Sequence, residues 1–236
     1  MKAILIPVKL FRASKTRLAS HFSDDARADL AAALCEDFFQ MVAQVKDAER
    51  VFVASREQHV LDTARANGWE VIVETEQISE SHSVDAASRF CEGRGIGALL
   101  RIPMDLPLAT AGDIGAILAE VEDSPSCILV PSRDGTGTNA LLRSPPTLFP
   151  SHFGPHSFAK HLAEAERCGA RVKILNQPHI ALDIDELNDL HALTGHVRPE
   201  SATARWIAQY PLSSWDLGDI AISQPGRTLG TPYHRP

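Results

Sequence analysis

The stretch Gly97-Ala-Leu-Leu-Arg-Ile-Pro-Met-Asp105-Leu-Pro107 decides how the rest of the chain is interpreted. Its first half is an almost continuous apolar run, which is typical of a strand that is buried in a sheet. Asp105 follows this run directly, so we expect its carboxylate at the carboxyl end of the strand. In parallel sheets ligands bind beyond the carboxyl ends of the strands, which makes Asp105 a candidate site residue.

On both sides of this stretch, apolar runs alternate with segments of helical periodicity. Ser23 is expected to cap the first helix, in which Leu30 and Leu34 fall on one face. Strands that alternate with helices predict an α/β fold, with a mainly parallel sheet covered by helices on both faces. The predicted strands are 3–8, 50–54, 70–73, 97–103, 127–131, 140–142 and 171–175, and the later helices are 57–66, 82–92, 110–121, 156–167, 186–193 and 200–209.

Residues 179–185, His-Ile-Ala-Leu-Asp-Ile-Asp, contain an alternation of apolar and acidic side chains. On a strand, a period of two places Asp183 and Asp185 on one face. Together with Asp105 they form a set of carboxylates that suits Mg²⁺, which prefers oxygen ligands and is commonly held by carboxylates and substrate phosphates. The competing interpretation is a turn in which Asp185 caps the helix over 186–193, since Asp is a preferred N-cap residue.

Composition and charge exclude several classes of protein. The chain has 236 residues, of which 44% are hydrophobic and 22% charged, as in an ordinary folded domain. Its net charge of −7 argues against a nucleic-acid binder. We find no apolar run of about 18 residues for a membrane span and no signal peptide before Lys9, so we expect a cytoplasmic protein. The four scattered cysteines indicate neither a disulfide framework nor a zinc site.

A basic loop follows the first strand and carries Lys9, Arg12, Lys15 and Arg17 within nine positions. It lies between a strand and a helix, where doubly wound sheets place a nucleotide. The loop has neither the Gly-x-x-x-x-Gly-Lys pattern of a P-loop nor a dinucleotide fingerprint. The pattern therefore indicates that side chains hold a triphosphate here. The alternative is a solvated basic surface.

Five motifs follow one another in the chain, and their order is informative. They are Pro7-Val-Lys9 with Ser14-Lys-Thr-Arg-Leu18, Asp105-Leu-Pro107, Gly135-Thr-Gly-Thr-Asn-Ala-Leu141, Phe153-Gly-Pro-His-Ser157 and Leu182-Asp-Ile-Asp185. Over about residues 3–195 the chain thereby resembles the guanylyltransferases that activate a small phosphorylated three-carbon acid in biosynthesis of the deazaflavin coenzyme F-420. Known substrates across that family are 2-phospho-L-lactate, phosphoenolpyruvate and 3-phospho-D-glycerate.

The resemblance implies a fold, a reaction and a set of site residues. The fold is the Rossmann-like nucleotide-diphospho-sugar transferase type, and the reaction transfers GMP from GTP to the acid's phosphate with release of pyrophosphate. The implied ligands of two magnesium ions are Asp105, Asp183 and Asp185. The implied acceptor site is formed by Thr138, Gly154 and Ser157. We expect the triphosphate on Lys9, Lys15 and Arg17, and we expect direct catalytic roles for Asp105, Lys15 and Arg17.

The acceptor site also makes sense chemically. Hydroxyl groups and a glycine N–H are donors to oxyanions, and Ser157 is expected at a helix start, which attracts anions. The alternatives are a plain cap at Ser157 and a plain turn at Gly154.

Two residues depart from the family pattern. Asp85, in Ser83-Val-Asp-Ala-Ala87, stands where an asparagine is expected, and we assign it to nucleotide binding. His156 replaces a small or acidic residue and is expected to influence which acid is accepted. Because of Asp85, a nucleotidyltransferase of the same fold that uses CTP or a sugar phosphate stays open. A nucleotide-binding protein without turnover is the third alternative.

The predicted organisation is a nucleotidyltransferase domain at residues 1–197, followed by a C-terminal helix and tail at residues 198–236. The tail beyond Pro211 is rich in Pro, Gly, Ser and Asp and shows little periodicity. It either wraps around the domain or meets a second subunit in a homodimer.

Overall fold

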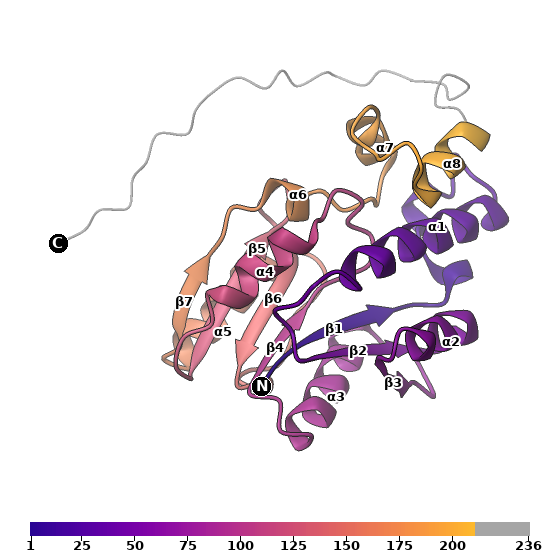
Figure 1. The fold of residues 1–236 in the computed structure, drawn as a ribbon. Coiled ribbons are helices and arrows are strands. Elements are labelled where there is room, and N and C mark those ends of the chain that lie inside the picture. The colour runs from indigo at the N-terminus through magenta and orange to yellow at the C-terminus, as the bar shows by residue number, and fades with distance from the viewer. Residues whose placement is uncertain (211–236) are drawn as a thin grey trace.

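The computed structural model describes residues 1–210, and the predicted tail lies outside the described residues. Seven strands form one sheet in the order β3-β2-β1-β4-β6-β5-β7 (Figure 1). They are β1 Lys2–Val8, β2 Arg50–Ser55, β3 Glu70–Val73, β4 Ala98–Arg101, β5 Ser126–Pro131, β6 Thr138–Ser144 and β7 Arg171–Ile174. These strands correspond to the seven apolar runs from which strands are predicted.

The sheet is mainly parallel, as predicted. Ile4 in β1 is in register with Val51 in β2 on one side and with Leu100 in β4 on the other. β6 runs antiparallel to both β4 and β5, because the short turn at 132–137 joins it to β5 as a hairpin. The reversal has a consequence for function, since it brings the first residue of β6, Thr138, to the edge where the parallel strands end.

Helices cover both faces of the sheet, which confirms the predicted layers (Figure 1). Side chains alternate along β1: Ile4 and Ile6 pack with one set of helices, while Ala3 and Leu5 pack on the opposite face. The first face is covered by α1 Asp24–Val42, α2 Gln58–Ala66 and α4 Ala111–Ala119. The opposite face is covered by α3 Glu80–Gly93 and α5 Ser157–Arg167. Within residues 1–210, no helix is both long and apolar enough to cross a membrane.

The helices α7, Leu187–Leu193, and α8, Ala202–Gln209, form a further layer outside α1 (Figure 1). Their apolar side chains share a buried cluster with those of α1. The carboxylate of Asp37 in α1 accepts the backbone N–H groups of Ala202 and Thr203, each at 2.8 Å. The indole N–H of Trp206 donates to the backbone oxygen of Ala26 at 2.9 Å. α8 is therefore built onto the first helix of the domain.

The segment 179–185 does not form the predicted strand. Pro178–Ala181 is a short helix, α6, and the residues up to Asp185 follow as irregular chain. The proline at the first position explains the start of α6, since its fixed φ suits a helix and its missing N–H is not needed there. Asp185 is not the cap of α7 either: Glu186 is the N-cap, and Asp189 accepts its N–H in return. Two 3-10 helices, Phe11–Ala13 and Thr16–Leu18, lie in the basic loop.

Candidate active site

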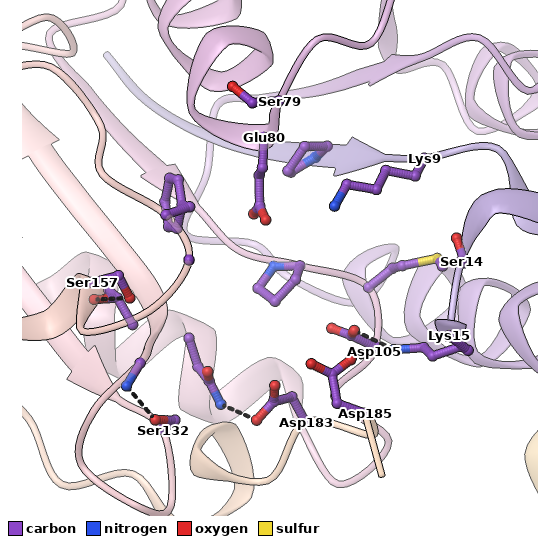
Figure 2. A pocket seen from close by; sticks show the side chains of 18 of the residues that line it. Lys9, Ser14, Lys15, Ser79, Glu80, Asp105, Ser132, Ser157, Asp183 and Asp185 are labelled. Carbon is purple, nitrogen blue, oxygen red and sulfur yellow. Dashed lines mark hydrogen bonds and ion pairs between the residues drawn. The ribbon is translucent and has the colours of Figure 1, made fainter. Parts of the chain in front are cut away.

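A cavity of about 1080 Å³ opens at the carboxyl ends of the parallel strands. Its walls are the loop after β1, the residues after β4, the hairpin turn with the start of β6, and the turn before α5. Figure 2 shows Lys15, Asp105 and Asp185 on one side of this space and Ser157 on the other, with Glu80 and Asp183 between them. The cavity thus contains all the site residues predicted from sequence except Asp85.

Lys15 is held between two carboxylates at the centre of one wall. Its ammonium lies 2.5 Å from Asp105 Oδ2 and 3.4 Å from Asp185 Oδ1, and its side chain is 4% exposed. Burial lowers the pKa of Lys15, but the charges of Asp105 and Asp185 outweigh this effect and the net pKa is raised. Its backbone has φ +55°, an unfavourable region for a side chain other than glycine and one that is common at functional sites.

Asp105 is the carboxylate that contacts Lys15 most closely. Burial raises the pKa of Asp105, but the Lys15 ammonium lowers it by more, so the carboxylate is charged. Its Oδ1 is buried and has no hydrogen-bond partner among residues 1–210. Its backbone oxygen accepts the N–H of Ile184 at 3.1 Å. This bond, together with those from the Asn139 side chain to the backbone oxygens of Ile180 and Ala181, holds the chain from 182 to 185 near the end of β4, so that two aspartates outside any strand reach Asp105.

Asp183 completes the acidic cluster. Asn139 at the start of β6 donates its side-chain N–H to Asp183 Oδ1 at 3.1 Å. Burial, together with the nearby charge of Asp105, raises the pKa of Asp183 to about 6. Burial is the larger cause of this shift, and the neighbouring carboxylates add to it.

The chemistry of these residues fits a magnesium ion. They offer carboxylate oxygens, which Mg²⁺ prefers, and the buried Oδ1 of Asp105 lacks a partner. In the described part of the chain, however, no three His, Cys, Asp or Glu side chains are already close enough to enclose one ion. The Lys15 ammonium instead bridges Asp105 and Asp185. A metal ion that binds here would therefore compete with Lys15.

Of the other residues predicted to bind the nucleotide, Lys9 and Arg17 line the cavity and Asp85 does not. Lys9 is exposed on the rim of the cavity, and Arg17 lies 3.3 Å from Asp185 with its side chain 63% exposed. The assignment of Asp85 to nucleotide binding is corrected. Its carboxylate accepts the backbone N–H of Ser151 at 3.0 Å and faces Arg143, so it stabilises the packing behind the cavity and does not line it.

The opposite wall carries the predicted acceptor residues. Thr138, at the start of β6, and Ser157, at the start of α5, are buried with their hydroxyl oxygens 3.3 Å apart. Gly154 has φ +110°, which favours glycine. The N–H of Ser157, at the start of the helix, is bonded to the backbone oxygen of Gly154 at 3.1 Å, so it is engaged within the turn. The Ser157 hydroxyl donates to Thr138 Oγ1, which leaves the Thr138 O–H proton available to donate to an acceptor.

Arg101 and Glu80 are among the charged residues of the cavity that were not predicted from the sequence. Arg101, in β4, donates to the carboxylate of Glu80 and to the backbone oxygen of Asn139, and its guanidinium stacks 4.0 Å from the centre of the Phe153 ring. The signal was available, because Arg101 interrupts the apolar run that led to Asp105. Glu80 carried no such signal, since an acid in the first turn of a helix is common.

Comparisons with known proteins agree with this geometry. Residues 1–205 match the family described as "Guanylyl transferase CofC like". Phosphoenolpyruvate guanylyltransferase of Rubrobacter xylanophilus is 35% identical over 191 residues, which cover 80% of this chain and 91% of the relative. The 3-phospho-D-glycerate guanylyltransferase of Colwellia psychrerythraea is 29% identical, with 80% and 90% covered. The 2-phospho-L-lactate guanylyltransferase of Methanothermobacter thermautotrophicus is 28% identical, with 81% and 83% covered.

Solved structures confirm the fold. A protein of Desulfovibrio desulfuricans assigned as a nucleotide-diphospho-sugar transferase superposes with a TM-score of 0.70 at 15% identity, covering 88% of this chain and 94% of that one. A nucleotidyl transferase of Methanothermobacter superposes with a TM-score of 0.59 at 13% identity, covering 83% and 97%. The sequence match over residues 1–205 identifies the chain: it belongs to the CofC-like guanylyl transferase family, a family of nucleotidyltransferases.

Proposed function

We propose that this enzyme transfers GMP from GTP to the phosphate of a small phosphorylated three-carbon acid and releases pyrophosphate, as a step of coenzyme F-420 biosynthesis. The acceptor is phosphoenolpyruvate, 3-phospho-D-glycerate or 2-phospho-L-lactate, on which relatives are named to act. The observation that carries the proposal is one cavity with two unlike walls. A cluster of three carboxylates and a lysine faces a pair of buried hydroxyls across it.

The acidic wall is the proposed nucleotide side. Lys9 and Arg17 are exposed at its rim, where they can contact a triphosphate without first losing buried partners. Lys15 is already bound to Asp105, so its ammonium is fixed in position before the nucleotide arrives. Fixed charges of this kind stabilise the negative charge that develops as pyrophosphate leaves.

Magnesium is the proposed cofactor, with Asp105, Asp183 and Asp185 as the side chains that would hold it. When bound, Mg²⁺ supplies positive charge that the phosphate oxygens need at the reacting centre. Two further observations support the proposal: the unpartnered Oδ1 of Asp105 and the raised pKa of Asp183. The first offers an oxygen ligand, and the second reflects in part the negative charge of Asp105 close to Asp183, which a bound cation would offset.

The hydroxyl wall is the proposed acceptor side. Thr138 suits an anion because a hydroxyl can donate to it without adding a charge that must be neutralised when the site is empty. Ser157 supports this donor, since its own hydroxyl is bonded to the Thr138 oxygen. An acceptor held there has its phosphate directed toward the carboxylate–lysine cluster. The attacking phosphate oxygen is already ionised near neutral pH, so the reaction needs no general base.

Pyrophosphate release measured with a panel of substrates tests the proposal. GTP, ATP, CTP and UTP are each combined with the three acids and with a sugar 1-phosphate, in the presence of magnesium. We expect release only with GTP and a three-carbon phospho-acid. Asp105→Asn should abolish it, whereas Asp29→Asn, a change at an exposed aspartate of α1, should leave it unchanged.

Other outcomes would identify the competing functions. Turnover with CTP or with the sugar phosphate would establish a different nucleotidyltransferase. Tight GTP binding in calorimetry, without pyrophosphate release for any acceptor, would indicate a protein that binds nucleotides and does not turn them over. The Asp85 departure does not favour either alternative, because that side chain is absent from the lining of the cavity and its carboxylate accepts the Ser151 N–H.

A further inference from the structure

The hydroxyl of Thr138 has two buried neighbours. His161 Nδ1 lies 3.0 Å from Thr138 Oγ1, and Ser157 Oγ lies 3.3 Å from it. All three side chains are buried, and His161 is 0% exposed. Thr138 and Ser157 line the cavity, whereas His161 lies behind them in the second turn of α5.

The position of the proton on His161 follows from its contacts. The backbone N–H of His152 donates to His161 Nε2 at 2.8 Å, so Nε2 must present a lone pair. A neutral imidazole has one N–H, and here it must be on Nδ1, which faces the Thr138 hydroxyl. A flipped ring would place carbon atoms against both partners and lose both hydrogen bonds.

The ring of His161 stays neutral over the physiological range. Burial, together with the positive charges of Arg101 and Arg143, lowers the pKa of His161 to about 3. The ring also packs edge-on against Phe153, with centroids 4.9 Å apart. Neither a second proton nor a rotation of the ring is therefore expected between pH 5 and 8.

These contacts determine what Thr138 can donate. Its oxygen accepts a proton from His161 Nδ1–H and another from the Ser157 hydroxyl, which uses both of its lone pairs. We propose that His161 is a positioning residue, which turns the Thr138 O–H proton into the cavity as a donor to the anionic group of the acceptor. This inference rests on the proposed function, because it assumes that the acceptor binds at Thr138.

The orientation of the Thr138 O–H matters because a hydroxyl proton can otherwise rotate freely about the C–O bond. Without His161, the Thr138 oxygen could turn a lone pair toward the acceptor's anion and its proton toward the protein. A group that is oriented in advance loses less freedom when the ligand binds. The effect should therefore appear in the KM of the acceptor and not in that of GTP, which is proposed to bind on the opposite wall.

Two variants distinguish the loss of the Nδ1–H donor of His161 from the loss of the volume of its ring. In His161→Asn, the amide nitrogen occupies the position of Nδ1 and can still donate to Thr138. In His161→Gln, the amide reaches the position of Nε2, where it can accept from the His152 N–H but cannot reach Thr138. Both changes disturb packing. We expect the phosphoenolpyruvate KM to rise about tenfold in His161→Gln, the equivalent of one ordinary hydrogen bond, and to stay within about threefold of wild type in His161→Asn.

A double-variant cycle tests whether the effect passes through Thr138. Thr138→Val should raise the phosphoenolpyruvate KM by roughly ten- to hundredfold, as expected for a lost hydrogen bond to a charged group. In the Thr138→Val background, His161→Gln should raise the phosphoenolpyruvate KM by less than about a further twofold, since the hydroxyl that His161 orients is absent. The KM of GTP should hardly change in any variant. If phosphoenolpyruvate is not turned over, the cycle is run with whichever of the other two acids is.

Several outcomes would overturn the proposal. Equal increases of the acceptor KM in His161→Asn and His161→Gln, or a full additive effect in the Thr138→Val background, would refute the positioning role alone. An unchanged acceptor KM in Thr138→Val would refute the acceptor site and this inference with it. Two-bond ¹⁵N–¹H correlation spectra of the full wild-type chain, labelled on histidine, add a test that needs no variant at His161. His161 should be the Nδ1–H tautomer from pH 5 to 8, and an Nε2–H or doubly protonated ring would overturn the proposal.

Discussion

Replacing Lys15 with methionine removes a buried cation from between two carboxylates while keeping most of the side-chain volume. In the native protein the Lys15 ammonium contacts Asp105 at 2.5 Å and Asp185 at 3.4 Å. After the substitution Asp105 loses its ion-pair partner, and its Oδ1 already lacks a hydrogen-bond partner among the described residues. Arg17 cannot take over, since its guanidinium is on the exposed side of Asp185.

The size of the effect follows from the burial of the pair. Removing one partner of a buried ion pair costs about 3–5 kcal/mol of stability, and proton uptake by the crowded carboxylates offsets part of that loss. We therefore expect Lys15→Met to lose about 3 kcal/mol, which for a domain of this size corresponds to roughly 6–12 °C in Tm. Lys9→Met, at an exposed lysine of the same loop, should change stability by less than about 0.5 kcal/mol.

Magnesium should stabilise the Lys15→Met variant more than it stabilises the wild type. In Lys15→Met the ion meets no internal competitor, so it should bind more tightly and restore most of the lost stability. A ligand at a hundred times its Kd stabilises a protein by about 2.7 kcal/mol. Thermal unfolding with increasing magnesium measures this directly. The reasoning is refuted if Lys15→Met without magnesium unfolds at the wild-type temperature, or if magnesium stabilises the wild type at least as much as the variant.

Three further predictions address other parts of the molecule. Asp183→Asn should abolish pyrophosphate release. It should not lower the Tm of the metal-free protein, because it relieves repulsion in the cluster. Near-wild-type turnover would show that catalysis does not need Asp183. His156→Gly should shift the ratio of kcat/KM among the three acids without loss of Tm, since glycine tolerates the φ of +57° at this position; an unchanged profile would assign His156 to the surface. Asp37→Ala should lower the free energy of unfolding in urea by about 2–4 kcal/mol, because two N–H groups of α8 lose a charged acceptor. A loss below about 1 kcal/mol, like that expected for the exposed Glu36→Ala, would contradict that account.

Much of the fold could be predicted because its signals are local. An apolar run fixes where β4 lies, and the alternation of strands and helices then implies that neighbouring strands end at the same edge. Asp105 was placed correctly by that argument. The reversed direction of β6 follows from the short turn that joins it to β5, but the sequence alone did not reveal which strands it would pair with.

The acidic pair shows how a correct placement can rest on a wrong element. Alternation over 179–185 predicted a strand, but Pro178 begins a short helix and Asp183 and Asp185 lie in irregular chain. The hydrogen bond from the Ile184 N–H to the Asp105 backbone oxygen and those from the Asn139 side chain to this segment bring them to Asp105. The pattern carried information on which side chains meet, whereas the type of backbone depended on a contact between residues far apart in the sequence.

Long-range contacts also explain the residues that sequence reasoning misplaced or missed. Asp85 and an asparagine of the family pattern occupy the same helix position, and only the folded chain shows that this position faces the Ser151 N–H. No motif in the sequence singles out His161. Its role depends on the His152 N–H and on Thr138, which is 23 positions away, and no spacing rule connects them.

Isotope tracing of the acceptor phosphate tests the central claim most directly, namely that an oxygen of this phosphate attacks the α-phosphorus of GTP. The enzyme is incubated with GTP, magnesium and each of the three acids, with the phosphate oxygens of the acid labelled with ¹⁸O. We expect a guanylylated acid whose mass retains the whole label, together with unlabelled pyrophosphate. Label in the pyrophosphate, loss of label from the product, or no product joining GMP to any of the acids would contradict the account.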